Sequence, residues 1–212
     1  MIYCLEYRLK LNELIFMKTG KNILDEELFR RIKCNDSIAL KVLYEKYYSS
    51  LCYFSSKFVK NTEIAEEVVS DVFLNIWMKR GRIEIRTSLK IYLYTSVRNR
   101  SLNYLKQIKI DFEDLETADK ENKSSELGAD RIINYEELND KINHLLKQLP
   151  EKREIVFRLN RVNGLSYKEI SEILSISINT VQNQMVRAVK FLSDQYPRFK
   201  KLFIWALLLI IK

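Results

Sequence analysis

Apolar residues recur at intervals of three and four along most of the chain, which is the spacing of amphipathic helices. The pattern is strongest over Thr62–Lys79, where one face carries Ile64, Ala65, Val68, Val69, Val72, Phe73, Ile76 and Trp77. Asn61 or Thr62 can cap the start of this helix, and Gly81 is expected to end it. Its other face is polar and mostly acidic, with Glu63, Glu66, Glu67 and Ser70, and with Asp71 on the flank.

Further helices are expected on both sides of that stretch. Asp25 can cap a helix that carries Leu28, Phe29 and Ile32 on one face, and Asp36 can begin another. A short basic loop, Arg82–Thr87, then leads into a helix from about Ser88 to Lys106. The low counts of glycine (4) and proline (2) fit long helices with few tight turns. We therefore predict an all-helical block over residues 24–108.

The next segment, residues 109–130, is acidic and reads as a solvated linker. It holds three lysines against eight carboxylates, a net charge of −5: Asp111, Glu113, Asp114, Glu116, Asp119, Glu121, Glu126 and Asp130. Ser124, Ser125 and Gly128 add to its polar, flexible composition.

The third block, residues 131–199, contains a helix-turn-helix pattern. One helix is expected over Tyr135–Gln148 and a second over Glu151–Arg161, separated by Pro150. Ser166 and Glu169 then form a capping box that starts a short helix. Ser175-Ile176 breaks this helix, and Ser177 caps the next one near Ile178. Two helices joined by such a tight turn are the outline of a DNA-binding motif.

The second helix of this motif has a polar face suited to the DNA major groove. Val181, Met185, Ala188 and Leu192 fall within a narrow arc and are predicted to face the core. The opposite side carries Asn179, Asn183, Val186, Arg187 and Lys190, with Gln182 at its edge. Amide side chains can pair with adenine and arginine with guanine. The alternative is an ordinary solvated helix face.

The helix over Ser88–Lys106 mixes aromatic and basic residues: Lys90, Tyr92, Tyr94, Arg98, Arg100, Tyr104 and Lys106. Such a mixture suits single-stranded DNA, because bases stack on rings while cations follow the phosphates. The alternative is that the tyrosines belong to the core.

Charge and chemistry narrow the class of protein further. The net charge of +8 favours a polyanionic partner. The three cysteines and the one histidine, His144, lack the spacing of metal ligands, and the sequence has no glycine-rich phosphate loop or nucleophile motif. We therefore expect no catalytic residue, no metal and no cofactor.

The two ends carry neither a signal-peptide core nor a membrane span. Charged residues interrupt Met1–Phe16, and the apolar run Leu202–Ile211 is much shorter than the roughly 18–20 residues that a span needs. A cytoplasmic protein is expected. Met17 directly precedes a Lys-Thr-Gly-Lys-Asn stretch and then a clean helix start. Residues 1–23 are therefore expected to be an N-terminal extension in which Met1 or Met17 can be the initiator. Residues 200–212 form an apolar tail.

Three segments together resemble extracytoplasmic-function sigma factors of the sigma-seventy superfamily. AEEVVSDVFLNIWMKR (Ala65–Arg80) and YLYTSVRNRSLNYLK (Tyr92–Lys106) resemble their domain two, and Gln148–Leu192 resembles their domain four. The order, the spacing and the acidic linker agree with the family. The chain is most similar to the iron-citrate-type group abundant in Bacteroides-like bacteria, whose members often pair with membrane anti-sigma regulators.

The resemblance implies a transcription initiation factor with three binding surfaces and no substrate. By this resemblance, the clamp of the RNA polymerase core is bound by Glu66, Glu67, Ser70, Asp71 and Asn75. Melted DNA of the downstream promoter element is expected to be bound by Arg82, Arg86, Tyr92, Tyr94, Arg98 and Asn99. Duplex DNA of the upstream element is expected to be bound by Gln182, Asn183, Val186, Arg187 and Lys190.

The sequence departs from many family members at three of these positions. Ser70 stands where glutamine is frequent, Tyr92 where tryptophan is frequent, and Gln182 where arginine or lysine is frequent. The change at Gln182 is expected to shift base preference away from guanine. Two other classes stay open: a response regulator, which needs a strand–helix receiver domain, and a helical adaptor that binds only protein.

Overall fold

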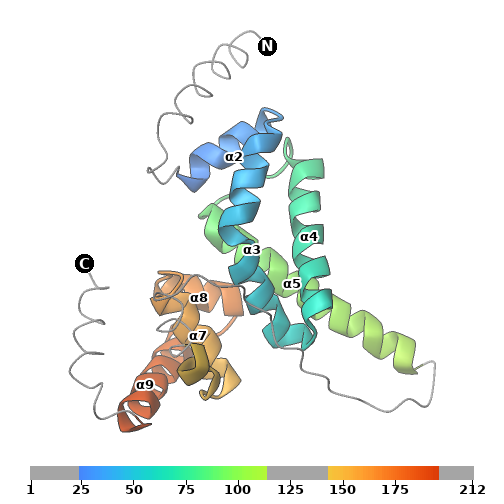
Figure 1. The fold of residues 1–212 in the computed structure, drawn as a ribbon. Helices are drawn as coiled ribbons and strands as arrows, with labels where there is room; N and C mark the ends of the chain where they lie inside the picture. Colours follow the sequence, from blue (N-terminus) through green and yellow to red (C-terminus); the bar gives the residue numbers. More distant parts are fainter. Residues whose placement is uncertain (1–23, 114–142, 196–212) are drawn as a thin grey trace, which may run out of the picture.

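The structure, a computed structural model, describes residues 24–113 and 143–195, and every regular element within them is a helix. In the first segment these are α2 (Asp25–Lys33), α3 (Ser37–Val59), α4 (Thr62–Lys79) and α5 (Leu89–Glu113). In the second they are α7 (Glu151–Arg161), α8 (Tyr167–Leu174) and α9 (Ile178–Gln195), preceded by helical residues 143–147. The all-α prediction is confirmed. Figure 1 shows the two groups of helices side by side.

The first domain is built around α3, which packs against α2, α4 and α5. Its core contains fully buried side chains from three helices, among them Leu43, Leu51, Val69, Ile76 and Leu93. Two side chains cap these helices as predicted. The Asp36 carboxylate accepts hydrogen bonds from the backbone N–H groups of residues 38 and 39, and the Asn61 side chain accepts one from that of residue 64.

Helix α4 has the predicted bounds: it ends at Lys79 with Arg80 as its C-cap, directly before Gly81. Two other expectations for this domain are wrong in detail. Leu24 and not Asp25 is the N-cap of α2, because the Asp25 carboxylate is used by α3, where it accepts hydrogen bonds from Lys46 and Tyr47. Helix α5 continues to Glu113 and so includes the start of the predicted linker. The rest of that linker, the N-terminal extension and the apolar tail lie outside the described residues.

The second domain packs α7 and α8 against α9. Ser166 and Glu169 form the predicted capping box, with both reciprocal hydrogen bonds present. Ser175 takes a left-handed conformation (φ 51°) and ends α8, and the Ser177 hydroxyl then accepts a hydrogen bond from the N–H of Thr180 at the start of α9. These local features set the angle at which α9 leaves the turn.

The two domains touch along α5 and α8 and, over a smaller contact, along α3 and α7. In Figure 1, α9 runs away from the first domain, with its lower end far from α3 and α5.

Candidate nucleic-acid interface

Helix α9 presents the predicted polar face to solvent. Its buried side consists of Val181, Met185, Ala188 and Leu192, as the periodicity predicts. On the outer side the five candidate residues are all exposed: Gln182, Asn183, Val186, Arg187 and Lys190. Val186 is 67% exposed although it is apolar, so this face is not one that the domain uses for its own packing.

The basic loop before α5 also places its charged side chains in solvent. Arg82 and Arg86 are exposed, while Ile83 and Ile85 pack against the core and anchor the loop between them. The apolar anchors alternate with exposed charged residues, so the loop holds two cations in solvent, with Glu84 between them. This arrangement can follow a phosphate backbone.

On α5 the candidate residues lie in different environments. Asn99 is exposed and Tyr92 is half-buried. Arg98 is half-buried, and its Nη1 donates a hydrogen bond to Ser175 Oγ at 3.2 Å, in the turn of the helix-turn-helix. Lys90, which the aromatic and basic pattern also includes, donates from Nζ to the backbone oxygen of Asn163 at 2.7 Å. Part of the expected DNA-binding face of α5 therefore lies against the second domain.

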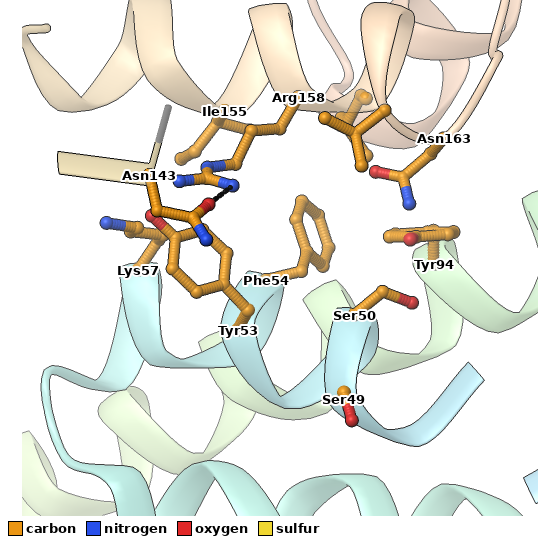
Figure 2. Close-up of a pocket in the computed structure, with 12 residues that line it drawn as sticks. Ser49, Ser50, Tyr53, Phe54, Lys57, Tyr94, Asn143, Ile155, Arg158 and Asn163 are labelled. Carbon is orange, nitrogen blue, oxygen red and sulfur yellow. Dashed lines mark hydrogen bonds between the residues drawn. The ribbon is translucent and has the colours of Figure 1, made fainter. Parts of the chain in front are cut away.

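Tyr94 differs most from the expectation of an exposed ring, because its side chain is fully buried. The ring packs edge-on against Phe54, with the ring centres 5.1 Å apart. Its hydroxyl lies at a cavity of about 310 Å³ between the domains, lined by α3, α5 and α7 (Figure 2). Burial raises the pKa of this hydroxyl above its ordinary value of 10.0. A base can stack on Tyr94 only after the second domain has moved away from α5.

The polar face of α4 is formed largely as the sequence predicts. Glu67, Ser70 and Asn75 are exposed, and Glu66 and Asp71 are half-buried. Two large apolar residues, Leu74 (58% exposed) and Met78 (69% exposed), lie on the same side of the helix. The exposure of both residues could have been predicted from the sequence, because neither falls on the apolar face of α4 that the spacing defines. Exposed apolar groups beside carboxylates suit a protein partner better than solvent alone.

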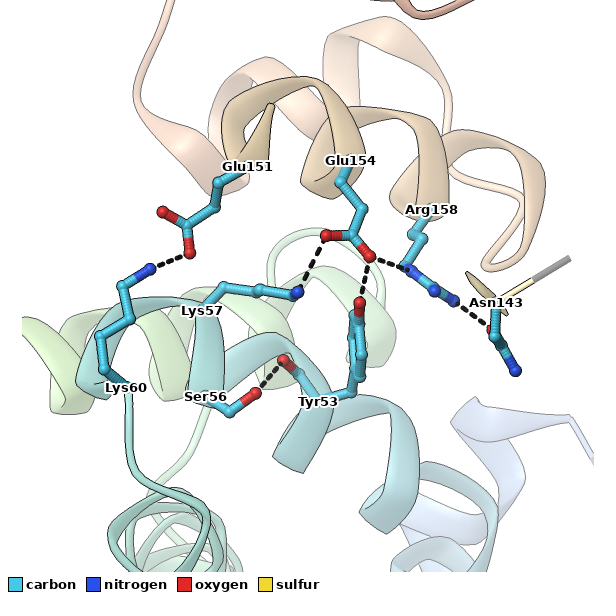
Figure 3. A network of polar contacts seen from close by, with 8 residues as sticks. All are labelled: Tyr53, Ser56, Lys57, Lys60, Asn143, Glu151, Glu154 and Arg158. Carbon is cyan, nitrogen blue, oxygen red and sulfur yellow. Dashed lines mark hydrogen bonds and ion pairs between the residues drawn. The ribbon is translucent and has the colours of Figure 1, made fainter. Parts of the chain in front are cut away.

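A polar cluster between the domains was missed by sequence reasoning. Glu154 of α7 is only 2% exposed. Its carboxylate accepts hydrogen bonds from Lys57 Nζ at 2.8 Å, from Arg158 Nε at 3.0 Å and from the Tyr53 hydroxyl (Figure 3). The sequence gives no signal for this cluster, because its members come from two distant helices.

The electrostatics of the cluster favour its charged form. Burial of Glu154 raises the pKa of its carboxyl, but the hydrogen bonds from Lys57 and Tyr53, the charge of Lys57 and the hydrogen bond from Arg158 outweigh burial, so the pKa lies below the ordinary 4.5. For Lys57 burial acts in the opposite direction and lowers the pKa of the amine. The bonds to Glu154 and Tyr53 outweigh this effect, so the pKa lies above the ordinary 10.5. Both groups are therefore charged at neutral pH.

By two observations, neither a metal-ligating cluster nor a reactive cysteine is found among the described residues. No group of three or more His, Cys, Asp or Glu among them could hold a metal ion. Burial raises the pKa of Cys52 to about 11, so it is a thiol at neutral pH and a poor nucleophile. No helix in this part of the chain is long and apolar enough to cross a membrane.

Comparison with known families matches both halves of the chain. Residues 43–109 match the family described as Sigma-70 region 2, and residues 139–192 match Sigma-70, region 4. Together the two matches span more than half of the chain.

Curated relatives match the chain over nearly their full length. The RNA polymerase sigma-H factor of Pseudomonas aeruginosa is 22% identical over 172 residues, which is 77% of this chain and 89% of the relative. The ECF RNA polymerase sigma factor SigW of Bacillus subtilis is 24% identical over 78% of this chain and 93% of its own length. The ECF RNA polymerase sigma-E factor of Escherichia coli is 24% identical over 80% and 92%.

Two solved structures share the fold. One is described as CnrH in complex with the cytosolic domain of CnrY, with 16% identity, a TM-score of 0.51, and coverage of 82% of this chain and 97% of that one. The other is the sigma factor RpoE in complex with the anti-sigma factor NepR from Bartonella quintana, with 19% identity, a TM-score of 0.53, and coverage of 73% and 94%.

Proposed function

The chain belongs to the sigma-70 family, with regions 2 and 4, and from that premise we propose how its surfaces select and open a promoter. It is a transcription initiation factor that directs RNA polymerase core to promoters, and it is not an enzyme. Its partners are the core polymerase and promoter DNA. The observation that carries the proposal is the exposed polar face of α9 in a domain that matches region 4.

The upstream promoter element is read by α9 in the major groove. Gln182, Asn183 and Arg187 are exposed hydrogen-bonding side chains on one face of the helix. Arg187 can make a bidentate contact with guanine, and the amides can pair with adenine. Val186 lies between them and can contact a thymine methyl group, while Lys190 lies one turn further and can reach a phosphate.

The melted downstream element is held by the loop before α5 and by α5 itself. Arg82 and Arg86 are placed to follow the phosphates, and Tyr92 offers a partly exposed ring for base stacking. Tyr94, Arg98 and Asn99 continue this surface along α5. Tyr94 and Arg98 can contact DNA only when the first domain has separated from the second.

The core polymerase docks on α4 through its polar face. Glu66, Glu67, Ser70, Asp71 and Asn75 supply acceptors and charge, and the exposed Leu74 and Met78 supply apolar contact area. An acidic helix face with an apolar strip suits a basic, partly apolar surface on the partner.

Finer assignments belong to the same proposal. We place the domain boundaries at residues 24–113 and 131–199, with a terminal extension before the first domain, the acidic linker between them and an apolar tail after the second. The chain acts in the cytoplasm, belongs to the iron-citrate-type group and is controlled by a membrane anti-sigma regulator. The name of one fold relative, a complex with an anti-sigma factor, supports an anti-sigma partner.

A simple experiment tests the function against the two other classes considered. Purified chain is mixed with core polymerase and passed over a gel-filtration column. A sigma factor co-elutes with core, and a response regulator does not. An adaptor that co-elutes would give no promoter-specific transcript, so both readouts together decide the class.

A further inference from the structure

The cavity lined by α3, α5 and α7 has an apolar middle. This part is formed by Phe54, Ile155 and Leu159, of which Phe54 and Leu159 are almost fully buried (Figure 2). The volume of about 310 Å³ lies at the lower end of the range for small-molecule sites, which is about 300–1,000 Å³. One lining residue, Val162, is 64% exposed, so the cavity opens to solvent on its side.

Arg158 supplies a fixed donor at one end of the cavity. Its Nε donates to Glu154 at 3.0 Å, its Nη1 donates to Asn143 Oδ1 at 3.0 Å, and its Cζ lies 4.3 Å from the centre of the Tyr53 ring. These contacts hold the guanidinium in one orientation. The remaining nitrogen, Nη2, is buried and has no hydrogen-bond partner among the described residues. An acceptor inside the cavity would recover the free energy that this unpaired donor costs.

Tyr94 supplies a second donor at the other end. Its side chain is fully buried, and its hydroxyl also has no hydrogen-bond partner among the described residues. Figure 2 shows Tyr94 and Arg158 on opposite sides of the Phe54 ring. Ser50 lines the cavity as well, but its hydroxyl donates to the backbone oxygen of Tyr47 at 2.9 Å and so supplies no donor there. The cavity therefore has a donor at each end and an apolar surface between them.

The local charge favours an anion at the Arg158 end. Among the described residues that line the cavity, Lys57 and Arg158 are cations and none is a carboxylate. The neighbouring Glu154 carboxylate accepts from both cations, at 2.8 Å from Lys57 Nζ and at 3.0 Å from Arg158 Nε. Two cations and one carboxylate leave a net charge of +1. Since an unbalanced charge in a buried position is costly, a ligand carboxylate would be stabilised there.

Water alone matches this cavity poorly. About 310 Å³ corresponds to about ten waters of roughly 30 Å³ each. Waters in the middle would lie against Phe54, Ile155 and Leu159, whose side chains offer no hydrogen bonds. A single molecule of about ten non-hydrogen atoms, polar at both ends and apolar between, matches the size and the lining together.

We propose that the cavity binds a small amphipathic carboxylic acid. The carboxylate accepts from Arg158, the apolar body lies against Phe54 and Leu159, and an oxygen acceptor at the far end accepts from the Tyr94 hydroxyl. This binding needs neither polymerase nor promoter DNA, so it is independent of the proposed function.

Binding is measured on the full chain with 4-methoxyphenylacetate, which has the three features of the proposed ligand. Methyl NMR follows the titration, and the signals of Ile155 and Leu159 report on the cavity. The wild type should bind with a dissociation constant of about 0.1 mM. 4-Methoxyphenylacetamide has the same shape without the charge and should bind about tenfold more weakly. If the acid at millimolar concentration leaves both methyl signals unchanged, the proposal is wrong and the cavity holds water only.

Arg158→Gln tests the anionic end. The ratio of acid affinity to amide affinity should fall about tenfold, because the variant removes the charge that distinguishes the two ligands. A loss of packing would weaken both ligands alike, so the ratio separates recognition from a structural effect. Lys152→Gln makes the same charge change at an exposed position of α7 outside the lining and should leave the ratio unchanged. A preference for the acid that persists in Arg158→Gln would overturn the proposed site.

Tyr94→Phe tests the far end and keeps the buried ring in place. The second ligand here is 4-ethylphenylacetate, in which a methylene replaces the ether oxygen. The affinity of the methoxy compound relative to the ethyl compound should fall about fivefold in Tyr94→Phe, which is the effect of one lost hydrogen bond. Since the hydroxyl has no partner within the chain, its removal leaves the fold intact. A relative affinity equal to that of the wild type would contradict the placement of the ligand between Arg158 and Tyr94.

Discussion

The Asp71 carboxylate on α4 accepts a hydrogen bond from the Arg100 guanidinium on α5, which joins the helix proposed to dock on core to the helix proposed to hold DNA. The two side chains are 36% and 55% exposed. Exposed pairs contribute about 0–1 kcal/mol to stability, so the pair orients two surfaces more than it holds the fold together. Core binding and stability can therefore be separated by substitution on α4.

Glu67→Lys should weaken binding to core polymerase at least tenfold, because it reverses a charge at the centre of the polar face of α4. Its exposed position predicts a change in the free energy of unfolding within about 0.5 kcal/mol. Affinity is measured by fluorescence anisotropy of labelled chain with core. Glu172→Lys makes the same charge change on exposed α8 and should bind normally. Equal loss from both variants would indicate a general charge effect.

Arg187→Ala should weaken the use of one base in the upstream element by about 1–3 kcal/mol, since the exposed guanidinium can make a bidentate contact with guanine. Binding to core should be unchanged. Transcription from a set of single-base promoter variants measures the effect. Lys152→Ala removes an exposed cation from α7 and is the control. If Arg187→Ala reduces every promoter variant equally, the side chain touches only phosphate.

Ser166→Ala should lower the free energy of unfolding by about 1 kcal/mol, because it removes the hydroxyl that accepts from the N–H of Glu169 at the start of α8. Thermal unfolding followed by circular dichroism measures the change. Ser37→Ala replaces an exposed serine that is not an N-cap and should have a much smaller effect. An unchanged melting curve for Ser166→Ala would show that the capping box does not stabilise the domain.

The contact between the domains should depend on pH through Glu154. The bonds from Lys57, Tyr53 and Arg158 lower the pKa of Glu154 while the two domains are in contact. The contribution of Glu154 to the stability of this contact is therefore complete above the ordinary pKa of 4.5 and is lost as the pH falls through the lowered value. The raised pKa of Lys57 has the opposite sign, so its contribution is complete below 10.5 and is lost above the raised value. Small-angle X-ray scattering should thus show the two domains in contact between the lowered pKa of Glu154 and the raised pKa of Lys57.

The variant Glu154→Gln isolates this effect from the titration of other carboxyls, such as Asp36. Its radius of gyration should be large already at neutral pH and should change less as the pH falls. If the radius of gyration of the wild type and that of Glu154→Gln change in parallel as the pH falls, the role of this carboxylate is contradicted.

The acidic linker should contribute to initiation through its charge. Its negative charge resembles that of a nucleic-acid strand, and we propose that it lies in the basic channels of the polymerase. Replacement of residues 114–130, after the end of α5, by an equally long Gly/Ser segment should leave promoter binding intact and weaken initiation, with altered abortive products. Normal initiation and a normal product pattern would favour a passive tether.

The sequence was sufficient to predict those features of the fold that depend only on residues close together in the chain. The capping box at Ser166, the caps at Asp36 and Asn61, and the buried and exposed faces of α9 follow from local spacing, and each is confirmed. The prediction for Asp25 is wrong because the choice of its partner depends on α3, more than a turn of sequence away. Glu154 could not be placed for the same reason, since its partners Lys57 and Tyr53 belong to the other domain. The burial of Tyr94 agrees with the alternative that the tyrosines of this helix belong to the core.

The most direct test of the account is transcription with purified core polymerase and the full chain on genomic promoter fragments, with start sites mapped by sequencing of the 5′ ends. The account predicts a small set of discrete start sites that appear only with the chain and share an upstream element. Those starts should be weakened by Glu67→Lys and shifted in base preference by Arg187→Ala. Start sites identical to those of core alone would contradict the central claim.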